Sequence, residues 1–202
     1  KNGIRVNLDV VFNHVYDKEN FAFENIVPNY FFLMNEQGDF SNGSWCGNDI
    51  DTTRRMSRRY FIDTCVWMTR FYHIDGLRLD VAYCLDENFV RELRAFCDSL
   101  KPDFFLVGEM LHGDYNTIVG NECLHSATNY ECYKGLYSSF NSMNMFEINH
   151  SLLRQFGPEN WTLYKGKHLL SFVDNHDVTR VASILNNIRH LPLIYALAFG
   201  MP

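Results

Sequence analysis

Short apolar segments alternate along this chain with longer segments of helical periodicity, and this alternation constrains the fold more than any other feature. Four apolar segments have the length of single strands, residues 6–12, 76–81, 104–107 and 169–173, and a fifth, less apolar strand candidate lies near residues 127–130. Nearly continuous apolar runs of this length are typical of parallel strands that are buried on both faces, and parallel strands are usually connected by helices. The pattern therefore predicts repeated βα units and a parallel sheet.

Two helices are predicted between these strands. Apolar residues recur at spacings of three and four over residues 53–72 and over residues 87–100. Pro102 prevents the second helix from continuing further. Residues 15–52 follow neither period and are rich in Asn, Gly, Asp and aromatic residues. An irregular stretch of this length is more often a functional insertion than a plain loop. We predict one α/β domain over residues 1–202 that carries a small inserted lobe at 15–52.

The charge and composition restrict the partners. The formal net charge of −6 argues against nucleic acid and anionic membrane surfaces, and no apolar run reaches the roughly 18 residues of a membrane span. A neutral substrate fits better. Aromatic residues make up 15% of the chain, enough either to stack on sugars or to fill a core, and we favour the core. The six cysteines lack a C-x-x-C pair and are predicted to be free thiols.

Four carboxylates stand at the ends of predicted strands, a position that active-site residues occupy in parallel barrels. They are Asp9, Asp80, Glu109 and Asp177. Asp80 and Glu109 are 29 residues apart, about one βα unit, and Glu109 and Asp177 are 68 apart, about two. Arg78 and Asp80 share one face of their strand because strand side chains alternate. Charged groups in an apolar sheet form either a structural ion pair or a site, and four strand ends together favour a site.

Four segments carry a family resemblance: residues 9–14 (DVVFNH), 76–80 (GLRLD), 108–109 (GE) and 172–177 (FVDNHD). Taken in order, they resemble the four sequence regions of the α-amylase family of retaining glycoside hydrolases, glycoside hydrolase family 13. The resemblance extends over essentially the whole chain. It implies a (β/α)8 TIM barrel that is incomplete in this chain, with about the third to the seventh strands present and the inserted lobe after the third.

The resemblance also implies roles. Asp80 would be the nucleophile, Glu109 the general acid/base, and Asp177 the residue that stabilises the transition state. The supporting, substrate-binding residues would be Asp9, His14, Arg78, Tyr83 and His176. A retaining glycosidase needs one ionised carboxylate and one protonated carboxyl, about 5–5.5 Å apart. We expect Arg78 to keep Asp80 charged, and Glu109, among other carboxylates, to keep its proton.

The implied activity is hydrolysis of α-glucosidic bonds, mainly α-1,4, in starch-derived oligosaccharides or polysaccharides. The subfamily signals conflict. Tyr83 and Cys84 stand where many α-amylases have a Lys-His pair, residues 81–82 are similar to maltogenic amylases and neopullulanases, and residues 47–49 and 72–76 are similar to debranching enzymes. Cleavage of α-1,6 bonds and opening of cyclodextrins therefore stay open as alternatives.

No cofactor is required by this chemistry, but calcium is a candidate. Asn13 matches a calcium-ligand position of the family, and Asp49 or Asp51 could add the oxygen ligands that calcium prefers. The alternative is that Asn13 has a structural role alone and ties the insertion to the barrel through hydrogen bonds.

Two alternative functions of a different class remain. One is a metal-dependent barrel hydrolase that uses the acids and histidines at the strand ends as ligands. The other is a non-catalytic carbohydrate-binding or scaffold protein on the same barrel. Retention of Asp80, Glu109 and Asp177 together argues against the scaffold.

The beginning of the sequence lacks an initiator Met and a signal peptide, as a piece of a longer protein would. Its 202 residues also fall short of the roughly 250 that a complete barrel needs. An open barrel exposes strand edges, so our hypothesis is that the 202-residue piece alone is inactive. The compartment is open, with the cytoplasm slightly favoured over secretion, and so is the oligomeric state.

Overall fold

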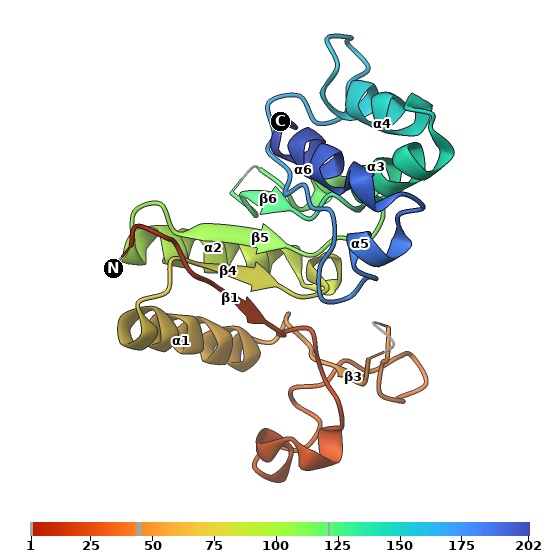
Figure 1. Ribbon diagram of the computed structural model, residues 1–202. Helices are drawn as coiled ribbons and strands as arrows, with labels where there is room; N and C mark the ends of the chain where they lie inside the picture. The colour runs from red at the N-terminus through yellow and green to blue at the C-terminus, as the bar shows by residue number, and fades with distance from the viewer. Residues whose placement is uncertain (1, 44–45, 121) are drawn as a thin grey trace. The chain divides into compact units, whose positions relative to one another are not determined.

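The computed structural model describes residues 2–43, 46–120 and 122–202. The chain forms two compact units (Figure 1). The first unit comprises residues 1–109 and 120–125, and the second comprises residues 110–119 and 126–202. Within the described ranges, no helix is both long and apolar enough to cross a membrane.

Three parallel strands form the sheet of the first unit: β1 (Asn7–Val10), β4 (Gly76–Leu79) and β5 (Phe105–Gly108). β4 lies in the middle and pairs with both neighbours (Figure 1), with Arg78 opposite Asp9 on one side and Val107 on the other. The first three predicted strands are thus confirmed, although β1 and β4 are shorter than expected. Because all three run in the same direction, their carboxyl ends meet at one edge of the sheet.

Two amphipathic helices pack on this sheet, as predicted. They are α1 (Arg55–Tyr72) and α2 (Glu87–Leu100). The Asp86 side chain caps α2 by accepting a hydrogen bond from Phe89 N. The apolar face of α2 includes Phe89 and Leu93, both fully buried. Phe12, which follows β1, stacks on Phe61 of α1 with 4.5 Å between ring centroids, so the sheet and the helix share one core.

The predicted lobe contains little regular structure. It holds η1 (Lys18–Asn20) and η2 (Ala22–Asn25), and β2 (His14–Val15) pairs in antiparallel fashion with β3 (Asn48–Asp49). Edge-to-face ring contacts link Phe21 to Phe31 and to Phe32, so these aromatic residues fill a small core. Residues 44 and 45 of the lobe lie outside the described residues, and the boundaries 15–52 stay a prediction.

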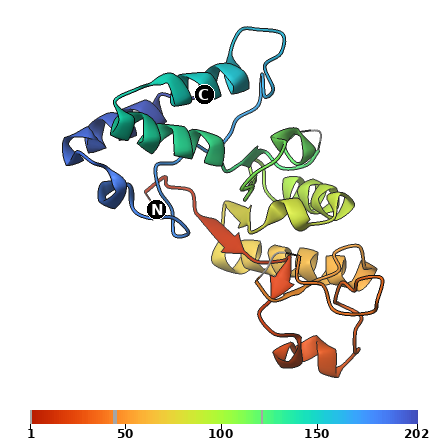
Figure 2. The same cartoon turned by 90° about the vertical axis from the view of Figure 1, so that its right-hand side faces the viewer.

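The second unit is mainly helical. It contains η4 (Tyr115–Thr117), β6 (Ser126–Ala127), α3 (Tyr130–Ser142), α4 (Phe146–Phe156), α5 (Val181–Ile184), η5 (Ile188–His190) and α6 (Leu191–Phe199). α3, α4 and α6 surround a core that includes Leu136, Ile148 and Ile194 (Figures 1 and 2). Gly135 allows α3 and α4 to pack closely, because a β-carbon at this position would lie 3.1 Å from the Ile148 Cα.

The predicted strand at 169–173 is wrong, and the one at 127–130 is shortened to β6. Only Leu170 forms a bridge, in parallel with Thr128. The pairing stops after Thr128 because the next residue, Asn129, is the N-cap of α3 and accepts a hydrogen bond from Cys132 N. The segment opposite Leu170 is therefore no longer extended. Phe172 instead stacks on Tyr133 with 5.1 Å between ring centroids.

Replacing Leu136 with Ala should lower the free energy of unfolding by about 2–5 kcal/mol, because it leaves a cavity in the core of the second unit. Leu153→Ala is the matched control, since Leu153 is 45% exposed whereas Leu136 is fully buried. Urea-induced unfolding of the full-length protein measures both changes. Equal losses in the two variants would contradict the described packing.

All six cysteines are thiols rather than disulfides, as predicted. Burial raises the pKa of Cys97 and of Cys132 to about 12, so almost none of either thiol is the reactive thiolate at pH 8. We therefore expect iodoacetamide at pH 8 to alkylate the exposed Cys46 and Cys84 in the native protein and to spare Cys97 and Cys132 until denaturant is added. Peptide mass spectrometry provides the readout, and modification of Cys97 in the native protein at the rate of Cys46 would refute the expectation.

Candidate active site

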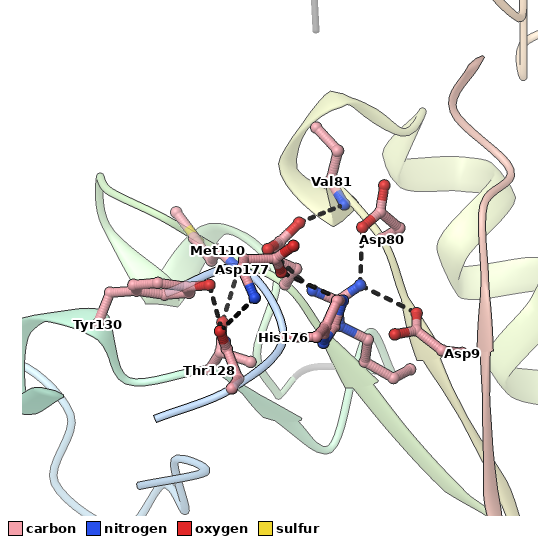
Figure 3. Close-up of polar contacts among 11 residues, drawn as sticks. Asp9, Asp80, Val81, Met110, Thr128, Tyr130, His176 and Asp177 are labelled. Atoms are coloured by element: carbon pink, nitrogen blue, oxygen red, sulfur yellow. Dashed lines mark hydrogen bonds and ion pairs between the residues drawn. The ribbon is translucent and has the colours of Figure 1, made fainter. Parts of the chain in front are cut away.

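The guanidinium of Arg78 holds three of the predicted carboxylates together. Arg78 Nη1 lies 2.9 Å from Asp9 Oδ1 and 2.7 Å from Asp80 Oδ1, and Arg78 Nη2 lies 2.8 Å from Glu109 Oε1. Figure 3 shows the contacts of Asp9 and Asp80. This geometry follows from the central position of β4, because a side chain on the middle strand reaches both neighbours.

Arg78 remains charged in this environment. Burial by itself would lower the pKa of Arg78, but the hydrogen bond to Asp9, the attraction of Glu109 and the hydrogen bond to Asp80 together raise it above its ordinary value. One cation therefore faces three acids. The expectation that Arg78 lies beside Asp80 is confirmed. Arg78 also pairs with Glu109, for which the sequence analysis had expected only acidic neighbours.

The backbone that follows β4 is strained beside the carboxylates. Val81 has φ 45° and ψ 44°, a left-handed conformation that a β-branched residue rarely adopts and that costs about 1–3 kcal/mol. Glu109 holds this turn at two points: Val81 N donates to Glu109 Oε2 at 3.1 Å, and Ala82 N donates to Glu109 O at 3.1 Å. Nothing in the sequence indicated this conformation.

Tyr83 and His14 also belong to the first unit. Tyr83 lies in η3 (Ala82–Cys84), directly after the strained turn, where burial raises its pKa, with Cys84 and Glu109 as further causes. His14 lies in β2 opposite Asp49. Within the described part of the chain, the buried Nδ1 of His14 has no hydrogen-bond partner. Binding of a sugar by either residue stays a prediction.

Asp177 and His176 lie at an exposed turn of the second unit, and both side chains are labelled in Figure 3. His176 Nε2 is 3.3 Å from Asp177 Oδ2, and Asp177 N donates to Asn175 Oδ1 at 2.9 Å. The turn is fixed at its base, because Asn175 Nδ2 donates to the Tyr130 hydroxyl at 3.0 Å. The sequence analysis missed Tyr130 as a site residue and placed it at the end of the predicted strand 127–130, whereas the structure places it at the start of α3.

The side chains around Asn13 form hydrogen bonds with one another. Asn13 is buried, and its Nδ2 donates to Asp49 Oδ1 at 3.5 Å. Asp49 Oδ2 also accepts from Ser41 Oγ at 2.7 Å, and Asp51 accepts from Arg54 Nε at 3.0 Å. The acids thus bind protein donors, and among the residues that the structure describes no cluster of three or more His, Cys, Asp or Glu could hold a metal. The hydrogen bond from Asn13 to Asp49 connects the residue before β2 to β3 of the lobe. Calcium binding stays a prediction.

Replacing Arg78 with Met should lower the free energy of unfolding by about 3 kcal/mol at neutral pH, because three neighbouring carboxylates lose their shared cation. The deficit relative to wild type should shrink in acid, since the carboxylates repel one another only when ionised. Denaturant titrations at several pH values test this. The control is Arg91→Met, whose solvent-screened pair with Glu87 should contribute far less than the Arg78 network, and a deficit that grows in acid would contradict the described network.

Comparisons with known proteins agree with the geometry. The sequence model of the alpha-amylase catalytic domain matches residues 44–201. The pullulanase of Bacillus subtilis (strain 168) is 45% identical over 109 residues, which cover 54% of this chain and 15% of that protein. The cyclomaltodextrinase of Thermoanaerobacter pseudethanolicus is 26% identical over 233 residues, which cover 100% of this chain and 38% of that protein.

A solved structure extends the agreement to the fold. The crystal structure of pullulanase type I from Bacillus subtilis str. 168 complexed with maltose has a TM-score of 0.76 and 28% identity, and covers 94% of this chain and 30% of that chain. The chain thus spans less than half the length of these relatives. The predicted α/β class, a (β/α)8 barrel of which this chain holds a part, is confirmed. Because the family model matches most of the sequence, the protein belongs to the alpha-amylase catalytic domain family.

Proposed function

We propose that the protein hydrolyses α-glucosidic bonds, mainly α-1,4, in starch-derived oligosaccharides or polysaccharides, with retention of configuration at the anomeric carbon. One observation carries the proposal: in a member of the alpha-amylase family, Asp80 and Glu109 follow adjacent parallel strands and contact the same guanidinium. Two neighbouring carboxyl groups are the equipment of a retaining glycosidase. The neutral substrate also accords with the net charge of −6.

In this proposal Asp80 attacks the anomeric carbon, and Glu109 first protonates the leaving oxygen and then activates water. Arg78 orients both carboxylates, and Asp9 fixes Arg78 from the other side. Asp177 stabilises the transition state, and His14, Tyr83 and His176 bind sugar hydroxyls. The guanidinium fills the position between the three acids, which disfavours the alternative of a metal ion held by the same acids.

A second candidate is cleavage of α-1,6 bonds. It is supported by the 45% identity to a pullulanase over 109 residues, which is higher than the 26% identity to a cyclomaltodextrinase over a longer alignment. Opening of cyclodextrins is the corresponding third candidate. All three share the proposed chemistry and differ in how the glucan is positioned.

The test incubates the full-length protein with maltoheptaose, and separately with pullulan, in which maltotriose units are joined by α-1,6 bonds. Proton NMR of fresh products should show the α-anomer first. Asp80→Asn should reduce the rate by about three orders of magnitude or more, because the variant lacks the attacking carboxylate.

Asp98→Asn is the matched control, since Asp98 pairs with Arg94 on the outer face of α2, and it should retain full activity. Release of maltotriose from pullulan without cleavage of maltoheptaose would assign the α-1,6 specificity. Initial release of the β-anomer would refute the retaining mechanism. Binding of both glucans without cleavage of either would instead favour a non-catalytic carbohydrate-binding protein.

A further inference from the structure

A cavity of about 630 Å³ lies at the start of α1 in the first unit, apart from the carboxylates around Arg78. Three guanidinium groups line it, from Arg55, Arg58 and Arg59. Of the described residues that line the cavity, only Glu92 is acidic, and Tyr30 and Thr53 contribute hydroxyl groups. This concentration of cations is unexpected in a chain whose formal net charge is −6.

The arginines are placed where they weaken the helix. The positive end of the helix dipole favours acids in the first turn, but the first turn of α1 has none, and its N-cap residue Arg54 makes no side-chain capping bond. α2 follows the usual rule, with Asp86 as the cap and Glu87 in the first turn. Arg55 also lies three and four residues from Arg58 and Arg59, a spacing at which like charges destabilise a helix by about 0.2–0.5 kcal/mol per pair.

Part of this cluster is held rigidly. Arg58 Nη2 lies 2.9 Å from Asp86 Oδ1, and Arg58 Nε donates to Thr52 O at 2.9 Å, so the guanidinium is fixed between the two helices. Arg58 Nη1 also lies 3.7 Å from Glu92 Oε2, and Arg59 Nε lies 2.7 Å from Asp63 Oδ2. Arg55 has no ion pair within the described part of the chain. Because each guanidinium carries five N–H donors, these pairs leave further donors for a ligand.

We infer that this cavity binds a phosphate group, either free or as the ester of a small sugar. A phosphate offers several acceptor oxygens and up to two negative charges, which match several guanidinium groups better than a carboxylate does. Its charge would balance that of Arg55, which pairs with no acid in the described part of the chain, and would favour the positive end of the helix dipole. Arg55 breaks the local helix rule without an ion pair in return, and such departures are typical of binding sites. The inference does not depend on the proposed hydrolysis.

The test is isothermal titration calorimetry of the full-length protein with inorganic phosphate and with glucose 6-phosphate, at constant ionic strength set with chloride. We expect saturable binding of at least one probe. Arg55→Gln and Arg59→Gln should each weaken it at least about tenfold, because each removes a charged donor. Arg70→Gln is the control, since Arg70 lies near the other end of the same helix and outside this cavity.

The two probes separate the sources of the phosphate group. Tighter binding of glucose 6-phosphate would identify a sugar ester as the ligand, and equal binding would identify the phosphate group alone. Phosphate should also raise the melting temperature of the wild type but not that of Arg55→Gln, which shows that the variant is folded and has lost the site. No saturable binding of either probe up to about 10 mM, or equal affinity in the wild type and both variants, would overturn the inference.

Discussion

The guanidinium of Arg78 is the interaction on which the candidate active site depends. Two unit charges of the same sign 4 Å apart near a protein surface repel by about 4 kcal/mol, so a cation placed between neighbouring acids stabilises their arrangement. β4 supplies that cation because it is the central strand, with Asp9 on β1 opposite Arg78 and Glu109 directly after β5. Parallel pairing and register thus convert three separate strand ends into one charged site.

Glu109 links this charge network to the backbone. Its Oε1 faces Arg78, and its Oε2 and main-chain oxygen accept hydrogen bonds from Val81 N and Ala82 N. These bonds hold Val81 in a conformation that its side chain disfavours, immediately after Asp80. The position of the proposed acid/base is therefore coupled to the exit of the strand that carries the proposed nucleophile.

Residue patterns predicted the parts of this molecule that depend on local chemistry. The bounds of α2 followed from its apolar periodicity and from Pro102, and the strand-end carboxylates marked the edge of the sheet at which three of them contact Arg78. The pairing of Arg78 with Glu109 could not be predicted, because it depends on the register between β4 and β5. Residues 169–173 looked like a strand by composition, but the start of α3 left only Thr128 for Leu170 to pair with.

The first unit holds two groups of charged side chains that differ in composition. Three acids surround Arg78, whereas three arginines line the cavity at the start of α1, two of them paired with acids and Arg55 with none in the described part of the chain. A neutral glucan would be neither attracted nor repelled by either group of charges over long range, so its binding should depend on hydrogen bonds and change little with salt. An anion would be repelled by the carboxylates and attracted by the arginines, and salt would weaken its binding. Charge alone would therefore direct the two proposed ligands to different sites of one small unit.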